Sequence, residues 1–280
     1  METRPSRLAF TAAVLLSTSA HAATWSDTFI GLSHGTQFAE PFITKDISKS
    51  IVNFTHASGY KYGSNFFSID YLMSSKDDPA FKGSSDGARE FYAVYRHTLD
   101  LGAVSDTSFK FGPVKGLGFT GGFDANSKTD AGYNSRKQML VAGPTLKLDV
   151  PGFFDVSLLQ LWESNAPYST FSGTGTPRYG YTPHPMISAV WGTPVGGFWF
   201  KGVANFISSK GKNEFGGATK PETFINTALM YDLSAAIGAP KNTFQAGLGY
   251  NWWKNKFGND ASVVPGAFAR TPTLRAEYHF

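Results

Sequence analysis

The chain has 280 residues and a net charge of +4 at pH 7, with 16% charged residues and no cysteine. Soluble domains usually carry about 25% charged residues, and so small a positive charge argues against a nucleic-acid partner. The absence of cysteine excludes disulfide bonds and thiolate metal sites. Low charge, 15% aromatic residues and 30 glycines are typical of a membrane β-barrel, in which apolar and polar residues alternate.

The first 22 residues have the pattern of a secretory signal peptide. Arg4 and Arg7 precede an apolar run that ends at Leu16, and Ala20-His21-Ala22 follows. A basic start, a short apolar run and an A-x-A site predict cleavage after Ala22. We therefore expect residues 1–22 to be removed and residues 23–280 to form one outer-membrane barrel domain.

From Trp25 onward, apolar and polar residues alternate with a period of two between groups of turn residues. This pattern predicts twelve strands, at 25–33, 48–57, 67–73, 88–100, 115–125, 137–149, 153–163, 184–192, 198–206, 222–233, 244–252 and 270–280. In the last of these, Leu274, Ala276, Tyr278 and Phe280 share one face. No segment sustains a helical period, so helices should be few.

The predicted connections alternate in length. Short or moderate Gly- and Pro-containing turns follow the even-numbered strands, such as Pro151-Gly152, and long polar loops follow the odd-numbered strands. An up-and-down outer-membrane barrel has this arrangement, with short periplasmic turns and long external loops. We therefore predict an all-β, twelve-stranded antiparallel transmembrane barrel, because a soluble Greek-key sandwich has no reason to sort its connections in this way.

Strand parity divides the side chains into two sets. Outward aromatic side chains near strand ends should lie at the membrane interfaces, and we expect Trp25, Trp162, Trp191, Tyr231, Trp252 and Tyr278 there. The inward set should line the pore and contact the solute. Its charged members are Asp70, Glu90, Arg96, Lys147, Lys201, Asp232, Arg275 and Glu277, and its aromatic members are Phe66, Tyr92, Trp199, Phe224 and Trp253. The charges could select solutes or simply pair across strands, and the aromatic rings could stack on planar solutes or fill space.

Two motifs suggest other chemistry but lack its structural context. Gly31-Leu-Ser-His-Gly35 matches a nucleophile elbow around Ser33, yet a loop follows where a helix is required. Gly116-Leu-Gly-Phe-Thr-Gly121 matches a dinucleotide fingerprint, yet it lies within an alternating strand. The histidines have no metal-ligand spacing, so we expect no metal, cofactor or catalytic residue.

Several strings resemble the nucleoside-specific outer-membrane channel (Tsx-like) family and its outer envelope protein relatives. They are Trp25-Ser-Asp-Thr-Phe-Ile-Gly, Phe38-Ala-Glu-Pro41, Tyr62-Gly-Ser-Asn-Phe-Phe-Ser-Ile-Asp70, Ser75-Lys-Asp-Asp-Pro-Ala80 and Glu90-Phe-Tyr-Ala-Val-Tyr-Arg96. The resemblance is concentrated in the first hundred residues. It implies a monomeric twelve-stranded barrel with a narrow pore for nucleosides or similar small solutes.

These observations predict a bacterial outer-membrane channel for passive diffusion of small polar solutes, with nucleosides as one candidate. Its expected partners are outer-membrane lipid, the solute, and the barrel-assembly machinery through Phe280. Two alternatives remain open. One is a lipid-facing hydrolase, for which the outward His97 is a candidate base. The other is a structural or adhesive barrel with a plugged lumen, in which loops 164–183 and 254–269 serve gating or adhesion.

Overall fold

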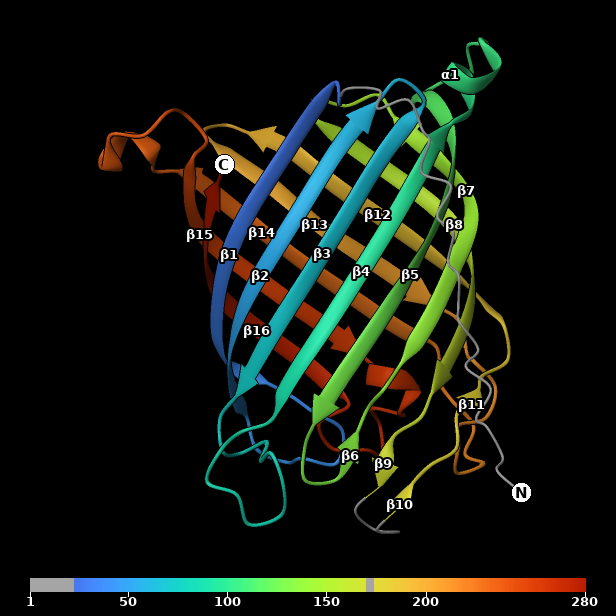
Figure 1. Cartoon of the computed structure of the whole chain (residues 1–280), viewed down its shortest axis with the longest axis vertical. Coiled ribbons are helices and arrows are strands. Elements are labelled where there is room, and N and C mark those ends of the chain that lie inside the picture. The colour runs from blue at the N-terminus through green and yellow to red at the C-terminus, as the bar shows by residue number, and fades with distance from the viewer. Residues whose placement is uncertain (1–22, 170–173) are drawn as a thin grey trace, which may run out of the picture.

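The computed structural model describes residues 23–169 and 174–280, so the predicted signal peptide lies outside the described residues. Twelve long antiparallel strands close into a barrel and are tilted across it (Figure 1). They are β1 (Trp25–Phe38), β2 (Ile47–Tyr60), β3 (Gly63–Ser74), β4 (Arg89–Asp100), β5 (Val114–Thr129), β7 (Gln138–Leu148), β8 (Phe153–Asn165), β12 (His184–Val195), β13 (Phe198–Ile207), β14 (Glu222–Asp232), β15 (Phe244–Lys254) and β16 (Phe268–His279). The predicted fold class and strand number are confirmed.

Each long strand pairs with its neighbours in the chain, and β1 pairs with β16 to close the ring. In this last pairing Ile30 lies opposite Tyr278, and Leu32 lies opposite Ala276. Closure gives the strand edges their hydrogen-bond partners, which is the condition for a sheet to cross hydrocarbon. Most strands extend a few residues beyond their predicted ends, because the pairing continues past the alternating segment.

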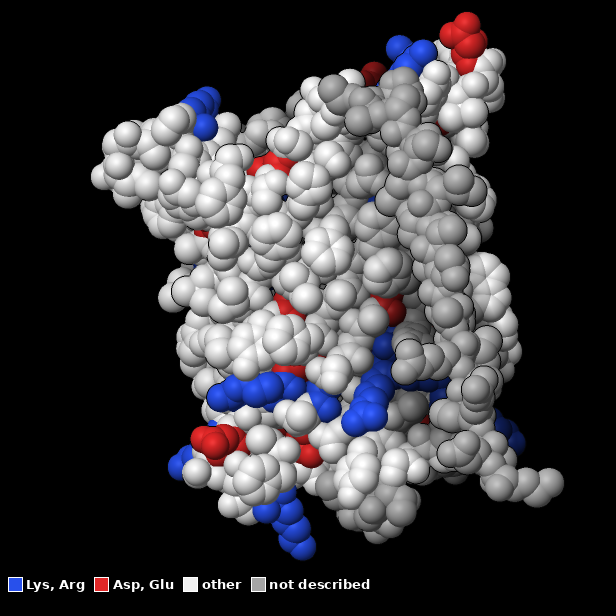
Figure 2. All heavy atoms as spheres, in the orientation of Figure 1, with Lys and Arg blue, Asp and Glu red and all other residues white. Residues whose placement is uncertain are grey.

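The outward face of the barrel is apolar. Its exposed side chains include Ile30, Leu32, Phe54, Phe91, Leu140, Leu158, Phe206, Leu229, Leu248 and Leu274. In Figure 2 the middle of the visible face is nearly free of charge, and lysine, arginine and acidic side chains gather toward the ends, most densely at the end with the long loops. An apolar band between polar ends matches the form of a membrane barrel.

The three tight turns lie at one end of the barrel, here called the turn end, together with the moderate connections that contain α1 and η1. The connections at the other end, the loop end, are loops (Figure 1). Gly152 at the turn end has φ of 80°, and a Cβ there would lie 2.1 Å from the carbonyl oxygen of Gly192, so only glycine fits this turn. The helices α1 (Leu101–Ser105), η1 (Ser234–Ile237) and η2 (Lys256–Gly258) are short, as expected. Within the described residues, no helix has the length and apolar character needed to cross a membrane.

Two predicted loops contain strands. The segment 126–136 continues β5 to Thr129 and includes β6 (Tyr133–Asn134). Segment 164–183 continues β8 to Asn165 and contains β9 (Tyr168–Ser169), β10 (Thr174–Gly175) and β11 (Tyr179–Gly180). The strands β6, β9 and β10 form a small second sheet, and β11 extends the barrel by pairing with β8. The prediction failed there because these strands are too short to show a period, and only pairing with distant segments defines them.

Two residues of the predicted aromatic belt differ from expectation. Trp25 alternates with the inward residues Asp27 and Phe29 and lies over Gly59 at the turn end, so it belongs to the inward set. Trp191 is outward but buried, because the rings of Phe154 and Phe200 pack against it, with centroids 6.0 and 5.6 Å away. The absence of a side chain at Gly202 leaves room for the indole.

Candidate pore and its closure

Contacts between non-adjacent strands identify the inward face. Lys201 on β13 donates to the Glu277 carboxylate on β16, although β14 and β15 lie between them in the sheet. Arg275 on β16 donates to Asn226 on β14 across β15. Such contacts are possible only through the interior. The strand registers place all thirteen predicted pore residues on the same face as these side chains.

The charged pairs near the turn end are held by several partners. His279 Nδ1 lies 2.7 Å from Asp27 Oδ1, and its Nε2 lies 3.3 Å from Glu277 Oε2. The Lys201 ammonium contacts Glu277 and also lies 5.4 Å from the Phe29 ring centroid. The predicted residues Lys201 and Glu277 therefore form one network with His279 and Asp27.

Polar side chains also pair around the middle of the barrel. Asn53 donates to Asp70 Oδ1 at 2.5 Å. The Arg96 guanidinium lies 2.6 Å from Asp124 Oδ1, and the Tyr92 hydroxyl donates to Asp124 Oδ2 at 2.9 Å. Pairing across neighbouring strands thus accounts for these charges.

Glu90 follows the same pattern nearer the loop end, where Asn126 donates to its Oε1 at 2.7 Å.

Among the inward aromatic residues, Phe66 is 38% exposed, and it pairs in register with Arg96. An exposed ring beside a guanidinium is the arrangement that could stack on a planar solute. Trp199 is half-buried opposite Met230.

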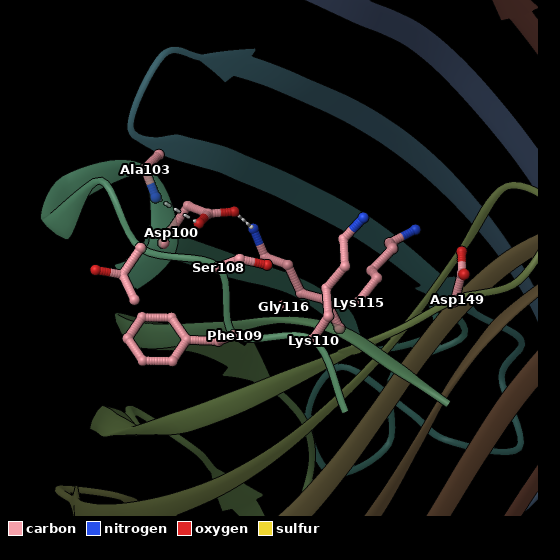
Figure 3. Close-up of a pocket in the computed structure, with 11 residues that line it drawn as sticks. Asp100, Ala103, Ser108, Phe109, Lys110, Lys115, Gly116 and Asp149 are labelled. Carbon is pink, nitrogen blue, oxygen red and sulfur yellow. Dashed lines mark hydrogen bonds and ion pairs between the residues drawn. The ribbon is translucent and has the colours of Figure 1, made fainter. Parts of the chain in front are cut away.

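Two predicted pore residues are engaged at the turn end. Lys147 Nζ donates to Asp100 Oδ2 at 2.8 Å, and the other oxygen of Asp100 accepts from the backbone of Ala103 and caps α1. These residues border a polar pocket of about 460 Å³, into which Lys110 and Lys115 also extend (Figure 3). Asp232 accepts from the backbone nitrogen atoms of Ser234 and Asn242, so its carboxylate stabilises the following turn.

At the loop end, side chains from the loops and from the barrel wall meet in a buried cluster of alternating charges. We call it the Glu40 cluster, and it consists of Glu40, Lys49, Asp78, Lys128, Asp130 and Lys256. Glu40 and Asp78 come from the β1–β2 and β3–β4 loops, and Lys256 comes from the β15–β16 loop. Lys49 and Lys128 project from the barrel wall. Three acidic and three basic side chains meet there, so the formal charges balance.

Glu40 has three lysine partners in this cluster. It accepts from Lys49, from Lys256 Nζ at 3.0 Å, and lies 3.7 Å from Lys128 Nζ. Burial opposes its ionisation, but the ammonium groups of Lys128, Lys256 and Lys49 hold the pKa of the carboxyl well below its ordinary value. Burial lowers the pKa of Lys256, while Glu40 acts in the opposite direction.

Two predicted aromatic residues belong to this closure. Trp253 packs edge-on against Phe224 and Phe257, with centroids 4.8 and 4.9 Å away, and Lys256 Nζ lies 4.5 Å from a Trp253 ring centroid. Loop residues therefore contact Trp253, and Trp253 in turn packs against Phe224. Their packing in this closed arrangement favours the space-filling alternative over stacking on a solute.

The β13–β14 loop is tied to the barrel wall at β8. Lys210, in the β13–β14 loop, donates to Glu163 Oε1 at 2.7 Å, and its Nζ lies 4.3 Å from the Tyr181 ring centroid. His184 is buried beside this pair, with Nε2 3.9 Å from Glu163 Oε2. Within the described residues, no group of histidine and acidic side chains has an arrangement suited to a metal ion.

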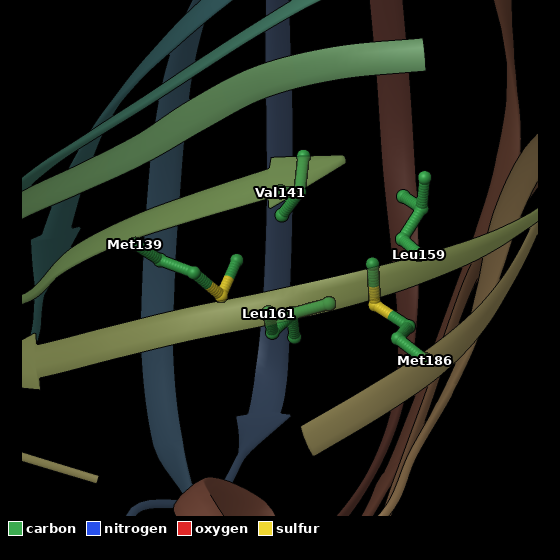
Figure 4. Close-up of a cluster of buried hydrophobic side chains, with 5 residues drawn as sticks. All are labelled: Met139, Val141, Leu159, Leu161 and Met186. Carbon is green, nitrogen blue, oxygen red and sulfur yellow. The ribbon is translucent and has the colours of Figure 1, made fainter. Parts of the chain in front are cut away.

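Part of the inner wall is apolar. Met139 and Val141 on β7, Leu159 and Leu161 on β8, and Met186 on β12 form a buried cluster (Figure 4). Ile207 on β13 packs against it. This sector of the inner wall is therefore a packed apolar core. The polar sector of the inner wall, along β16 and β1 to β4, lies outside this cluster.

Most of the Glu40 cluster escaped sequence reasoning. Glu40, Asp78 and Lys256 lie in loops, where no periodicity assigns a side-chain direction. Lys128 lies beyond the predicted end of its strand. Lys49 alternates with Ile51 and Asn53, so parity alone could have identified it as inward.

No protein-family model and no curated protein matches the chain. Among solved structures, it is similar to the translocator domain of autotransporter NalP from Neisseria meningitidis, with 11% identity over 93% of this chain and 90% of that chain, and a TM-score of 0.43. The transport unit of the autotransporter AIDA-I from Escherichia coli has 12% identity, coverage of 96% and 94%, and a TM-score of 0.34. The CymD monoaromatic hydrocarbon channel has 11% identity, coverage of 90% and 88%, and a TM-score of 0.32. None of these three structures is described as a nucleoside-specific channel.

Proposed function

We propose that this chain is an outer-membrane channel that conducts small polar solutes by passive diffusion, and that its loops restrict the external mouth. The observation that carries the proposal is the contrast between the apolar outward face of the barrel and a polar sector of its inner wall, in which charges pair across the interior, as those of Lys201 and Glu277 do. The apolar exterior suits contact with lipid. Charged side chains along the interior are typical of a pore that conducts polar solutes.

The path that we propose follows the polar sector of the wall. Arg96 and Asp124 lie on one side of it, and Arg275 lies on β16, close enough to Asp70 for their charges to influence each other. Phe66 offers an exposed ring within this sector. A ring beside paired donors and acceptors would suit a solute with a planar base and a polar sugar, so nucleosides are the first solutes to test.

Single-channel recording in planar bilayers tests this function. The purified, folded barrel should give discrete conductance steps, and added nucleosides should partly block them if the pore selects nucleosides. Steps without block would retain the channel and remove the nucleoside proposal. A folded, heat-modifiable barrel that inserts but never conducts would favour a structural barrel closed by its loops.

A second candidate function rests on one observation on the outer face. His34 Nδ1 lies 3.0 Å from Ser50 Oγ, and both side chains are outward on β1 and β2. A serine and an imidazole in hydrogen-bond reach could form part of a lipid-facing hydrolase. Within the motif Gly31 to Gly35, Ser33 is inward, so His34 rather than Ser33 is the residue placed for such chemistry.

The earlier candidate base, His97, is held by Asn65 Oδ1 at 2.9 Å and Tyr60 Oη at 3.3 Å, so it has no serine partner in the described part of the chain. Phospholipid hydrolysis in mixed micelles tests the pair. An enzyme would lose activity with Ser50→Ala and with His34→Gln and keep it with His97→Gln. Absence of hydrolysis by the folded wild-type barrel would exclude this candidate.

A further inference from the structure

A groove of about 420 Å³ lies on the outward side of three neighbouring strands, β5, β7 and β8, toward the loop end. The strand registers arrange its lining in rows. Phe123, Leu140 and Trp162 lie side by side in one row, and Ala125, Gln138 and Ser164 lie in the next row toward the loops. The rings and Leu140 are among the exposed large hydrophobic side chains, with Leu140 60% exposed.

Two exposed arginines lie beyond the polar row, on the side of the loops. Arg136 is exposed and lies two residues before Gln138. The preceding Ser135 donates to the inward Asn126, so alternation along the chain directs Arg136 outward. Arg178 donates to Ser164 Oγ at 3.0 Å and to the carbonyl oxygen of Arg136 at 3.2 Å, which fixes its guanidinium at the loop-end margin of the groove. Apolar, polar and cationic side chains thus follow one another within three adjacent strands.

We propose that this groove binds a phosphorylated, acylated glycolipid of the lipid A type. An acyl chain would lie against Phe123, Leu140 and Trp162. The sugar would meet Gln138 and Ser164, and a phosphate would bind the guanidinium groups of Arg136 and Arg178. Guanidinium groups bind phosphate through paired hydrogen bonds, and their charge is complementary to that of the ligand.

The inference rests on the proposed outer-membrane location, because only there do the long loops face the leaflet that contains such a glycolipid. The order of the rows is what favours a lipid over a protein partner. A protein interface needs no progression from apolar to cationic along the membrane normal, whereas a lipid has this progression in its own structure. The amide of Gln138 and the hydroxyl of Ser164 suit sugar hydroxyls at the middle level.

Native mass spectrometry of the full chain in detergent tests the proposal with three probes: bis-phosphorylated lipid A, dephosphorylated lipid A and phosphatidylglycerol. The double variant Arg136→Gln/Arg178→Gln removes the phosphate contacts, and Leu140→Gln alters the apolar row. Arg270→Gln and Leu248→Gln are matched controls, since Arg270 is an exposed outward arginine at the loop end and Leu248 is an exposed outward leucine elsewhere. Heat-modifiable migration shows that each variant is folded.

Wild type should retain bis-phosphorylated lipid A, and the double variant should bind it at least about tenfold more weakly, as expected for loss of hydrogen bonds to a charged group. Leu140→Gln should weaken retention of both forms of lipid A, and the controls should retain them. Equal binding of dephosphorylated lipid A, equal binding of phosphatidylglycerol, or equal loss in Arg270→Gln would each overturn the proposal. Conductance of the same samples separates the two questions, because a conducting barrel without lipid A contradicts only this inference.

Discussion

Lys256 Nζ lies 3.0 Å from Glu40 Oε1, which joins two loops that are 216 residues apart in the sequence. The contact links the first loop of the barrel to the last, beside the β1–β16 pairing. Lys49 and Lys128 add ammonium groups from the wall on the other side of Glu40. This single carboxylate therefore joins the β1–β2 and β15–β16 loops to each other and to the barrel wall.

Glu40→Gln should open the loop end. The substitution leaves three buried ammonium groups with less negative charge, and removing one partner of a buried ion pair costs on the order of 3–5 kcal/mol. We expect higher single-channel conductance, or a larger open fraction, with little change in barrel assembly. Asp46→Asn in the same loop is the control, because Asp46 is exposed and should leave conductance unchanged. Identical traces for Glu40→Gln and wild type would show that the cluster does not limit the pore.

The closure should persist in mild acid and fail only in strong acid. The pKa of Glu40 is well below its ordinary value of 4.5, so its contribution to closure is complete above pH 4.5 and is lost as pH falls through the lowered value. Conductance at pH 4.5 should therefore match that at pH 7 and rise at lower pH. Glu40→Gln should lack this rise. An increase that begins above pH 5 would mean that another group controls the loops.

Phe66→Ala tests whether the exposed inward ring contacts a planar solute. Base–aromatic stacking contributes about 1–3 kcal/mol by alanine substitution, so nucleoside block should weaken by roughly tenfold. The matched control is Phe91→Ala, because Phe91 is exposed on the outward face and should leave block unchanged. If both variants retain wild-type block, Phe66 is not part of the solute path.

Leu161→Ala should destabilise the barrel far more than Leu158→Ala, although both leucines lie on β8. Leu161 is fully buried in the inward apolar cluster, whereas Leu158 is 54% exposed on the outward face. A buried leucine truncated to alanine costs about 2–5 kcal/mol because a cavity remains. Denaturant unfolding in detergent micelles, followed by heat-modifiable migration, measures the difference. Equal stability of the two variants would indicate a lumen that is wet in this sector.

The alternation of residues determined much of the fold in advance. Leu274, Ala276 and Tyr278 alternate with Arg275 and Glu277, and a period of two has only one structural meaning, a strand with an apolar and a polar face. Because alternate residues of a strand point to opposite faces of the sheet, Arg275 and Glu277 could be assigned to the interior from sequence. Turn residues and loop lengths are also local features of the chain, so they predicted which connections share each end of the barrel.

Only the tertiary structure decided which inward residues meet. The Glu40 cluster draws on four loops and two strands, and no local pattern relates Glu40 to Lys256 or Asp78 to Lys128. The same holds for the apolar sector around Leu161, which forms because three strands place apolar residues at one level of the closed barrel. Alternation sets the face of each side chain, but its partner across the lumen depends on register and closure, which the whole ring determines together.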